Sequence, residues 1–218
     1  MNIAVSSYFA KALNKQFDLP FIVVANMVKI RESKPTEKRL VKYDVIHVGT
    51  FNENKNQMLL LESLFNYRFG RILLVGEGPN EKQLKDFVVH NQLSDLVTFL
   101  PFQPRNELLM LMEQSACLAI TSHHETFGVV AIEALSCGIP VIATKSGGPE
   151  DIVIEGESGY LIESTPWAFY TAFCKISEDL SKFRPEKLIA FANEHFSEKA
   201  IASKLSALYL SIISKTNG

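Results

Sequence analysis

Residues Ser122–Val141 read SHHETFGVVAIEALSCGIPV. Within this stretch, seven residues separate two glutamates, Glu125 and Glu133. The apolar residues between them recur at helical spacing and predict a helix that opens at Phe127 or Gly128 and runs past Glu133. Glu133 would then lie about two turns into the helix, and Glu125 would lie on the loop before it. The two carboxylates are therefore expected to flank the N-terminus of a helix.

A helix N-terminus presents unpaired N–H groups and the positive end of the helix dipole, so it favours phosphate. Gly128 would let a phosphate approach the backbone closely. Carboxylates beside a phosphate site suit neutral hydroxyls, and a nucleotide-sugar carries both kinds of group. The alternative is structural: Glu125 stabilises the helix end electrostatically, and Glu133 lies on a solvated face above an apolar core.

Short apolar runs alternate with amphipathic segments along the chain. The predicted strands are 21–25, 44–48, 71–75, 97–100, 117–121 and 140–143, and the predicted helices between them include 56–67, 80–90 and 106–113. This alternation is typical of an α/β fold in which helices cover both faces of a parallel sheet. Ligands of such sheets bind at the carboxyl ends of the strands, and the motifs after Val48, Val75 and Thr121 all lie there.

Composition narrows the class of protein. The 218 residues are 47% hydrophobic and 21% charged, with a net charge of -2, which gives no basic surface for nucleic acid. No apolar run approaches the roughly 18 residues of a membrane span, and no secretory signal is evident, so a cytoplasmic location is expected. Cys117, Cys137 and Cys174 form no CxxC pair and are predicted to be buried thiols.

Several motifs together resemble the C-terminal domain of family 4 retaining glycosyltransferases, which have the GT-B fold. They are ETFGVVAIEA from Glu125, SCGIPVIAT from Ser136, GGPEDIV from Gly147, VGTF from Val48 with Lys55 after it, VGEGP from Val75, and GESGYL from Gly156. The motifs that begin at Val48 and Gly156 lie more than a hundred residues apart. The resemblance implies a Rossmann-like, nucleotide-sugar-binding half of a GT-B enzyme that transfers sugar with retention at the anomeric carbon.

The resemblance also assigns roles. Lys55 would stabilise the charge that develops on the diphosphate leaving group, and Glu125 would bind a hydroxyl of the donor sugar and oppose positive charge on its ring. Glu133 would bind the ribose hydroxyls. Thr50 stands where the family carries an arginine, so one expected positive charge is missing. With Lys55 and Glu125 as catalytic residues, the implied substrate-binding residues are Gly49, Thr50, Glu77, Gly78, Thr126, Phe127, Gly128, Val129 and Glu133.

The resemblance further implies a division of the chain. Residues 1–40 would be a remnant of an N-terminal domain with a polar interdomain linker at 31–39, residues 41–196 the nucleotide-sugar-binding domain, and residues 197–218 a C-terminal helix that Ser197 caps. The acceptor-binding N-terminal domain would be missing. The implied partners are the nucleotide-sugar donor, an unknown glycan or lipid-linked acceptor and the missing domain, with peripheral membrane association open for a longer form.

Several residues argue against other chemistries. The GEGP loop is not a GxGxxG dinucleotide fingerprint, because Glu81 stands at the last glycine position. His123 and His124 lack a third metal ligand, and neither a metal nor a cofactor is expected. Phe102 is predicted to be a core residue, with stacking on a base as the alternative. Two other functions stay open, namely a non-catalytic nucleotide-sugar-binding module and a GT-B nucleotide-sugar epimerase.

Overall fold

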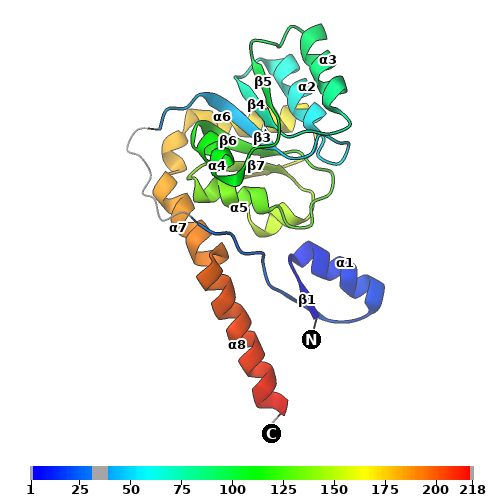
Figure 1. Cartoon of the computed structure of the whole chain (residues 1–218), viewed down its shortest axis with the longest axis vertical. Helices are drawn as coiled ribbons and strands as arrows, with labels where there is room; N and C mark the ends of the chain where they lie inside the picture. Colours follow the sequence, from blue (N-terminus) through cyan, green and yellow to red (C-terminus); the bar gives the residue numbers. More distant parts are fainter. Residues whose placement is uncertain (1, 31–38, 217–218) are drawn as a thin grey trace.

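The computed structural model describes residues 2–30 and 39–216 (Figure 1). Its main body is a parallel sheet of six strands in the order β5-β4-β3-β6-β7-β8. The strands are β3 (Tyr43–Val48), β4 (Ile72–Val75), β5 (Val97–Leu100), β6 (Ser115–Ile120), β7 (Val141–Thr144) and β8 (Gly159–Ile162). Nearly every residue of the three central strands is buried, as the apolar runs of the sequence predict.

Helices cover both faces of this sheet, which confirms the predicted fold class (Figure 1). α2 (Gln57–Tyr67) packs against α3 (Glu81–His90) and α6 (Pro166–Glu178) on one face. On the other face, α5 (Val129–Ser136) packs against α4 (Arg105–Glu113) and α7 (Pro185–Phe196). Two short 3-10 helices, η1 (Gly148–Asp151) and η2 (Leu180–Lys182), complete the connections.

Strand β8 is absent from the predicted strands, although its residues belong to one of the quoted motifs. It is short and begins with Gly159, a residue type that strands disfavour. The pairing with β7 explains the glycine, because a Cβ at this position would lie 1.8 Å from the carbonyl oxygen of Val141. Gly159 therefore disfavours a strand in the sequence, yet the close contact between β8 and β7 requires a glycine at this position.

The first residues form a small unit outside the main sheet (Figure 1). β1 (Asn2–Ala4) pairs in parallel with β2 (Phe21–Val23), and α1 (Ser7–Phe17) connects them. The predicted strand at 21–25 thus ends two residues earlier than expected. The expected linker at 31–39 lies outside the described residues except for Arg39, whose guanidinium donates to the carbonyl oxygens of Glu113 and Gly138.

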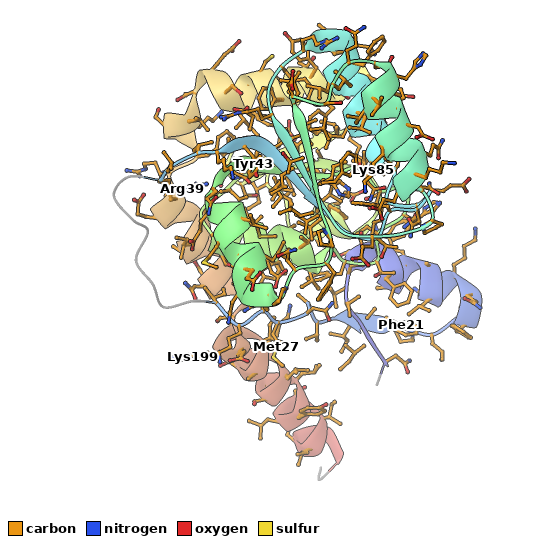
Figure 2. All side chains as sticks on the ribbon, turned by 45° about the horizontal axis from the view of Figure 1, so that its top comes forward. Phe21, Met27, Arg39, Tyr43, Lys85 and Lys199 are labelled. Carbon is orange, nitrogen blue, oxygen red and sulfur yellow. The ribbon has the colours of Figure 1, made fainter. Side chains whose placement is uncertain are left out.

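The C-terminal helix α8 (Glu198–Thr216) extends away from the main body (Figure 1). Ser197 Oγ accepts a hydrogen bond from Ala200 N at 3.2 Å, which confirms the predicted cap. The segment that leads from β2 to the main sheet passes this junction, since Val28 N donates to the carbonyl oxygen of Phe196. Figure 2 shows the neighbouring Met27 beside Lys199 at this point.

Candidate functional site

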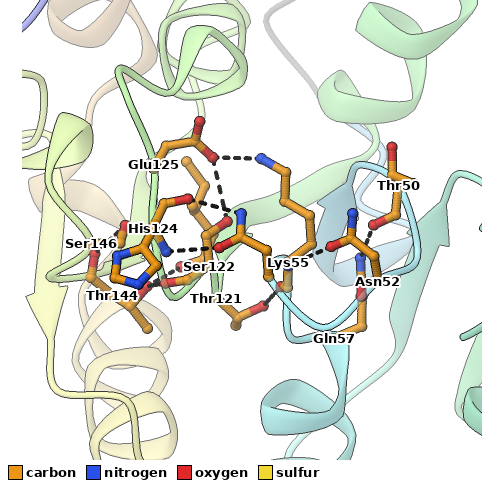
Figure 3. Close-up of polar contacts among 12 residues, drawn as sticks. Thr50, Asn52, Lys55, Gln57, Thr121, Ser122, His124, Glu125, Thr144 and Ser146 are labelled. Atoms are coloured by element: carbon orange, nitrogen blue, oxygen red, sulfur yellow. Dashed lines mark hydrogen bonds and ion pairs between the residues drawn. The ribbon is translucent and has the colours of Figure 1, made fainter. Parts of the chain in front are cut away.

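The site is centred between β3 and β6. The strand order reverses there, because β4 and β5 follow on one side of β3 whereas β6, β7 and β8 follow on its other side. Such a switch point opens a crevice beyond the carboxyl ends of the strands. The loops that follow β3 and β6 meet there (Figure 3). Asn54 joins the two loops. Its side chain donates to His124 O at 2.9 Å and accepts from His124 N at 3.0 Å, and its backbone oxygen accepts from His123 N at 2.8 Å.

Lys55 and Glu125, the two predicted catalytic residues, form an ion pair across this crevice (Figure 3). Lys55 Nζ lies 2.5 Å from Glu125 Oε2, and the side chains are only 26% and 14% exposed. Thr121 Oγ1 donates to Lys55 O at 2.8 Å, and Asn52 Oδ1 accepts from Lys55 N at 2.9 Å. Two residues 70 positions apart are therefore held in contact by a hydrogen-bonded frame, at a depth where solvent screens their charges only in part.

A second ion pair involves Glu133, the residue predicted to bind ribose. Arg105, the first residue of α4, places Nε 2.8 Å from Glu133 Oε1. The Glu133 side chain is 14% exposed, so the structural alternative of a solvated face residue is wrong. Neither Arg105 nor Asn54 is among the predicted site residues. Both contacts join segments far apart in the sequence, and no local spacing pattern indicates them.

Helix α5 begins later than predicted. Gly128 is its N-cap, with a φ of +93° that favours glycine, and Val129 is the first helical residue. Glu133 consequently lies about one turn into the helix instead of two. No side chain caps this helix end, and Ala131 N donates to the carbonyl oxygen of Gly128 at 2.9 Å. Within the part of the chain that the structure describes, the N–H groups of Val129 and Val130 are therefore the ones left for a ligand.

Around this helix end, Thr126 is exposed and Val129 is 39% exposed, whereas Phe127 is buried at 2%. The Phe127 ring packs edge-on against Phe196, so only its backbone can serve a ligand. Gly148 N donates to Glu125 O at 2.7 Å, and a Cβ at Gly148 would lie 2.2 Å from Phe127 Cα. Two backbone segments are thus pressed together beside the crevice, with no room for a side chain between them.

A cavity of about 410 Å³ lies over the carboxyl ends of β3 and β4. It is lined by Val48, Gly49, Thr50, Val75, Gly76, Glu77, Phe102, Gln103 and Leu108. The predicted residues Gly49, Thr50 and Glu77 are therefore together. Gly78 lies beside them, where a Cβ would approach Phe51 O to 2.4 Å. Phe102 is 76% exposed at the cavity, so its prediction as a core residue is wrong.

His47 lies in β3 beneath the Lys55 loop, and its side chain is 1% exposed. Its Nδ1 has no hydrogen-bond partner among the described residues. Burial, with a smaller contribution from the charge of Lys55, lowers the pKa of His47 to about 4. The imidazole is therefore neutral at physiological pH and leaves Lys55 as the positive charge at this end of β3.

This pKa predicts that acid destabilises the protein through His47. The unfolded chain has a histidine pKa near 6.5, so between that value and about 4 the unfolded state binds a proton that the folded state does not. The free energy of unfolding should fall by about 3 kcal/mol as the pH drops from 7 to 4. Urea unfolding across this range measures the loss. His47→Phe should show a smaller pH dependence, and an unchanged dependence would exclude His47 as its source.

The described residues contain no group of three or more His, Cys, Asp or Glu side chains that could hold a metal ion, and His123 and His124 are exposed. Within the same residues, no helix is long and apolar enough to cross a membrane. Cys117 and Cys137 are buried as predicted, and burial raises the pKa of Cys137 to about 12. Cys174 is only partly buried.

Comparison with known proteins identifies the family of the chain. Residues 28–196 match the family model described as "Glycosyl transferases group 1". The chain belongs to this family. The match covers the whole parallel sheet together with α2 to α7.

Among curated relatives, an uncharacterized glycosyltransferase of Methanocaldococcus jannaschii is 33% identical over 162 residues, which are 74% of this chain and 44% of that protein. D-inositol 3-phosphate glycosyltransferase of Mycolicibacterium smegmatis is 33% identical over 186 residues, which are 81% of this chain and 40% of that protein. This member of the glycosyl transferases group 1 family thus spans less than half the length of these relatives.

Among solved structures, Anabaena Alr3699/HepE in complex with UDP-glucose matches with a TM-score of 0.81 and 25% identity, over 94% of this chain and 63% of that chain. Sucrose-phosphate synthase from Thermosynechococcus elongatus matches with a TM-score of 0.84 and 23% identity, over 98% of this chain and 58% of that chain. The Rossmann-like α/β arrangement of the main body is shared with these proteins.

Proposed function

We propose that this chain is the C-terminal, donor-binding domain of a GT-B glycosyltransferase of the family 4 type, which transfers a sugar from a nucleoside diphosphate sugar with retention. The observation that carries the proposal is the contact between Lys55 Nζ and Glu125 Oε2 at the switch point of the sheet. The proposal takes the ammonium group as the cation for a diphosphate and the carboxylate beside it as the acceptor for a sugar hydroxyl. Retention rests on the resemblance to family 4 enzymes and on no distance in the site.

In this proposal the donor would occupy the site in three parts. Lys55 and the first-turn N–H groups of α5 would hold the diphosphate, and Glu125 would accept a hydroxyl of the sugar. Glu133 would accept the ribose hydroxyls. The 410 Å³ cavity would receive the base, and the exposed ring of Phe102 is available to stack on it. The relative Alr3699/HepE, solved in complex with UDP-glucose, supports a nucleotide-sugar as the ligand.

The chemistry follows from where charge develops. Cleavage of the bond between the anomeric carbon and the phosphate oxygen leaves negative charge on the diphosphate and positive charge on the sugar ring. Lys55 would stabilise the first charge and Glu125 the second. Thr50 adds a hydroxyl donor at the cavity and no charge, so Lys55 carries more of the stabilisation than it would beside an arginine.

The division of the chain into a remnant at 1–40, a nucleotide-sugar-binding domain at 41–196 and a C-terminal helix at 197–218 is part of this proposal. The β1–α1–β2 unit exposes Ile3, Phe17, Leu19 and Ile22, and α8 exposes Tyr209, Leu210 and Ile213. Large apolar side chains exposed on both elements favour burial against further protein. An N-terminal acceptor domain would supply that surface, together with the site for a glycan or lipid-linked acceptor.

Calorimetric titration with UDP, GDP and ADP tests the proposal. One nucleotide should bind selectively, and Glu133→Ala should weaken it about tenfold, because the variant loses a hydrogen bond to a charged group. Glu194→Ala is the matched control, since Glu194 is an exposed glutamate of helix α7. Absence of binding by all three nucleotides would contradict the proposal, and equal binding by Glu133→Ala would remove Glu133 from the site.

A non-catalytic nucleotide-sugar-binding module is the second candidate, and Thr50 is the observation that favours it. A site with one cation for a diphosphate, itself paired with Glu125, is less suited to stabilising a leaving group than a site with two. Release of nucleoside diphosphate from a bound nucleotide-sugar distinguishes the two functions. Binding without release in the presence of acceptor would establish the module.

A further inference from the structure

Arg105 contacts two segments that are distant in the sequence, helix α5 and the segment between β2 and β3. Its Nε lies 2.8 Å from Glu133 Oε1, and its Nη2 donates to the carbonyl oxygen of Lys29 at 2.8 Å. Lys29 belongs to the segment that leads from the β1–α1–β2 unit to the main sheet, and Glu133 belongs to α5. One guanidinium therefore fixes a carboxylate of the candidate donor site and is itself fixed by a backbone carbonyl.

This arrangement decides which oxygen of Glu133 is available. Oε1 accepts the hydrogen bond from Arg105, whereas no described side chain donates to Oε2. A carboxylate that is only 14% exposed would also be costly without a counter-charge, and it would repel the phosphates of a nucleotide nearby. Arg105 removes both penalties and leaves one oriented acceptor free.

We propose that Arg105 is a positioning residue for ribose recognition, which sets how strongly the site prefers a ribonucleotide over its 2′-deoxy counterpart. The inference rests on the proposed function, because it takes Glu133 as the ribose acceptor. Arg105 itself need not touch the ligand. It acts by holding the Glu133 carboxylate in the orientation that accepts a 2′-hydroxyl.

The geometry also explains why a lysine could not replace Arg105 fully. A guanidinium has several donors in a rigid fork, so it reaches Glu133 and the carbonyl of Lys29 at the same time. A lysine ammonium at the end of a flexible chain keeps the charge but does not reproduce that fork. Arg105→Lys should therefore recover the neutralisation of Glu133 and only part of its orientation.

The test compares the affinities of UDP, GDP or ADP, whichever binds tightest, and of its 2′-deoxy form. Wild-type protein should prefer the ribonucleotide about tenfold, in line with one hydrogen bond to a charged group. Arg105→Gln should reduce this preference to less than about threefold, and Arg105→Lys should lie between them. Arg71→Gln is the matched control, because Arg71 pairs with Asp44 at the opposite end of the strands and should leave the ratio unchanged.

The outcomes separate the two proposals. An unchanged ratio in Arg105→Gln and Arg105→Lys, with the ribonucleotide still preferred, overturns the positioning role and leaves the proposed function intact. Equal weakening of both nucleotides also overturns it, since that is the effect of a lost charge. Failure of wild-type protein to bind any of the three ribonucleotides overturns both proposals. Thermal unfolding of each variant verifies that it is folded. If Arg105→Gln does not fold, the ratio of ribonucleotide to 2′-deoxynucleotide affinity in Arg105→Lys decides the test.

Discussion

Replacing Lys55 by alanine should weaken the binding of the preferred nucleoside diphosphate about 100-fold. The variant loses a charge-assisted contact to the diphosphate, of the order of 2 kcal/mol. It also leaves Glu125, which is only 14% exposed, without the cation that lies 2.5 Å away, and its charge then repels the ligand. Because Thr50 brings no positive charge, the cavity loop offers no replacement. Calorimetric titration measures the loss.

A double substitution divides this effect into its two causes. Lys55→Ala with Glu125→Gln removes the buried negative charge together with the cation, so the affinity should be about threefold higher than that of Lys55→Ala alone. Lys85→Ala is the control, because Lys85 forms an exposed ion pair with Glu81 on helix α3, outside the crevice. If Lys55→Ala binds as tightly as wild-type protein, the diphosphate does not lie at Lys55 and the donor placement is wrong.

The strands and helices of the main body were predictable because their signals are local. β5 has the predicted bounds, and the ends of β3, β4 and β7 each lie within one residue of the predicted ends. Each of these strands is an apolar run bounded by polar or glycine-rich turns. β8 was not predicted, because its close contact with Val141 requires glycine at position 159, where a strand usually has a larger residue. That contact joins two strands and leaves no periodic pattern in the sequence.

The site was predictable to the extent that its motifs lie at strand ends. Lys55 and Glu125 follow β3 and β6, and adjacent parallel strands bring their loops to one edge of the sheet. The partners of Glu133 and of the Glu125 loop were not predictable. Arg105 and Asn54 reach them across 28 and 70 residues, and such contacts depend on how the layers of the fold pack. The start of α5 shifted because glycine at positive φ ends the preceding loop at Gly128.

The two ion pairs give the crevice a balanced charge before a donor arrives. Lys55 neutralises Glu125 and Arg105 neutralises Glu133, so each of the two largely buried carboxylates has a counter-charge. A diphosphate that binds at Lys55 must compete with Glu125 for the ammonium group. Binding would thereby loosen Glu125 from Lys55 and let its Oε2, which also accepts from Ser122 Oγ at 3.4 Å, accept from a sugar hydroxyl. In the proposed function, this exchange would couple donor binding to the presentation of Glu125.

The exchange predicts opposite effects of Glu125→Gln on binding and on turnover. The amide releases Lys55 from its ion pair without removing the cation, so nucleoside diphosphate should bind as tightly as in wild-type protein or up to about tenfold tighter. Release of nucleoside diphosphate from the nucleotide-sugar should fall about 100- to 1000-fold, because a neutral amide does not oppose positive charge on the sugar ring. Calorimetry measures the first quantity and steady-state kinetics the second.

Glu163→Gln is the matched control for both measurements, because Glu163 pairs with Lys145 at an exposed position and is not among the proposed donor-binding residues. A purely structural role of Glu125 would lower binding and turnover together, since the loops after β3 and β6 would separate in the variant. The proposed role lowers turnover alone. Parallel losses of affinity and rate in Glu125→Gln would therefore assign Glu125 to the frame of the site and leave the positive charge on the sugar ring to be opposed by another group.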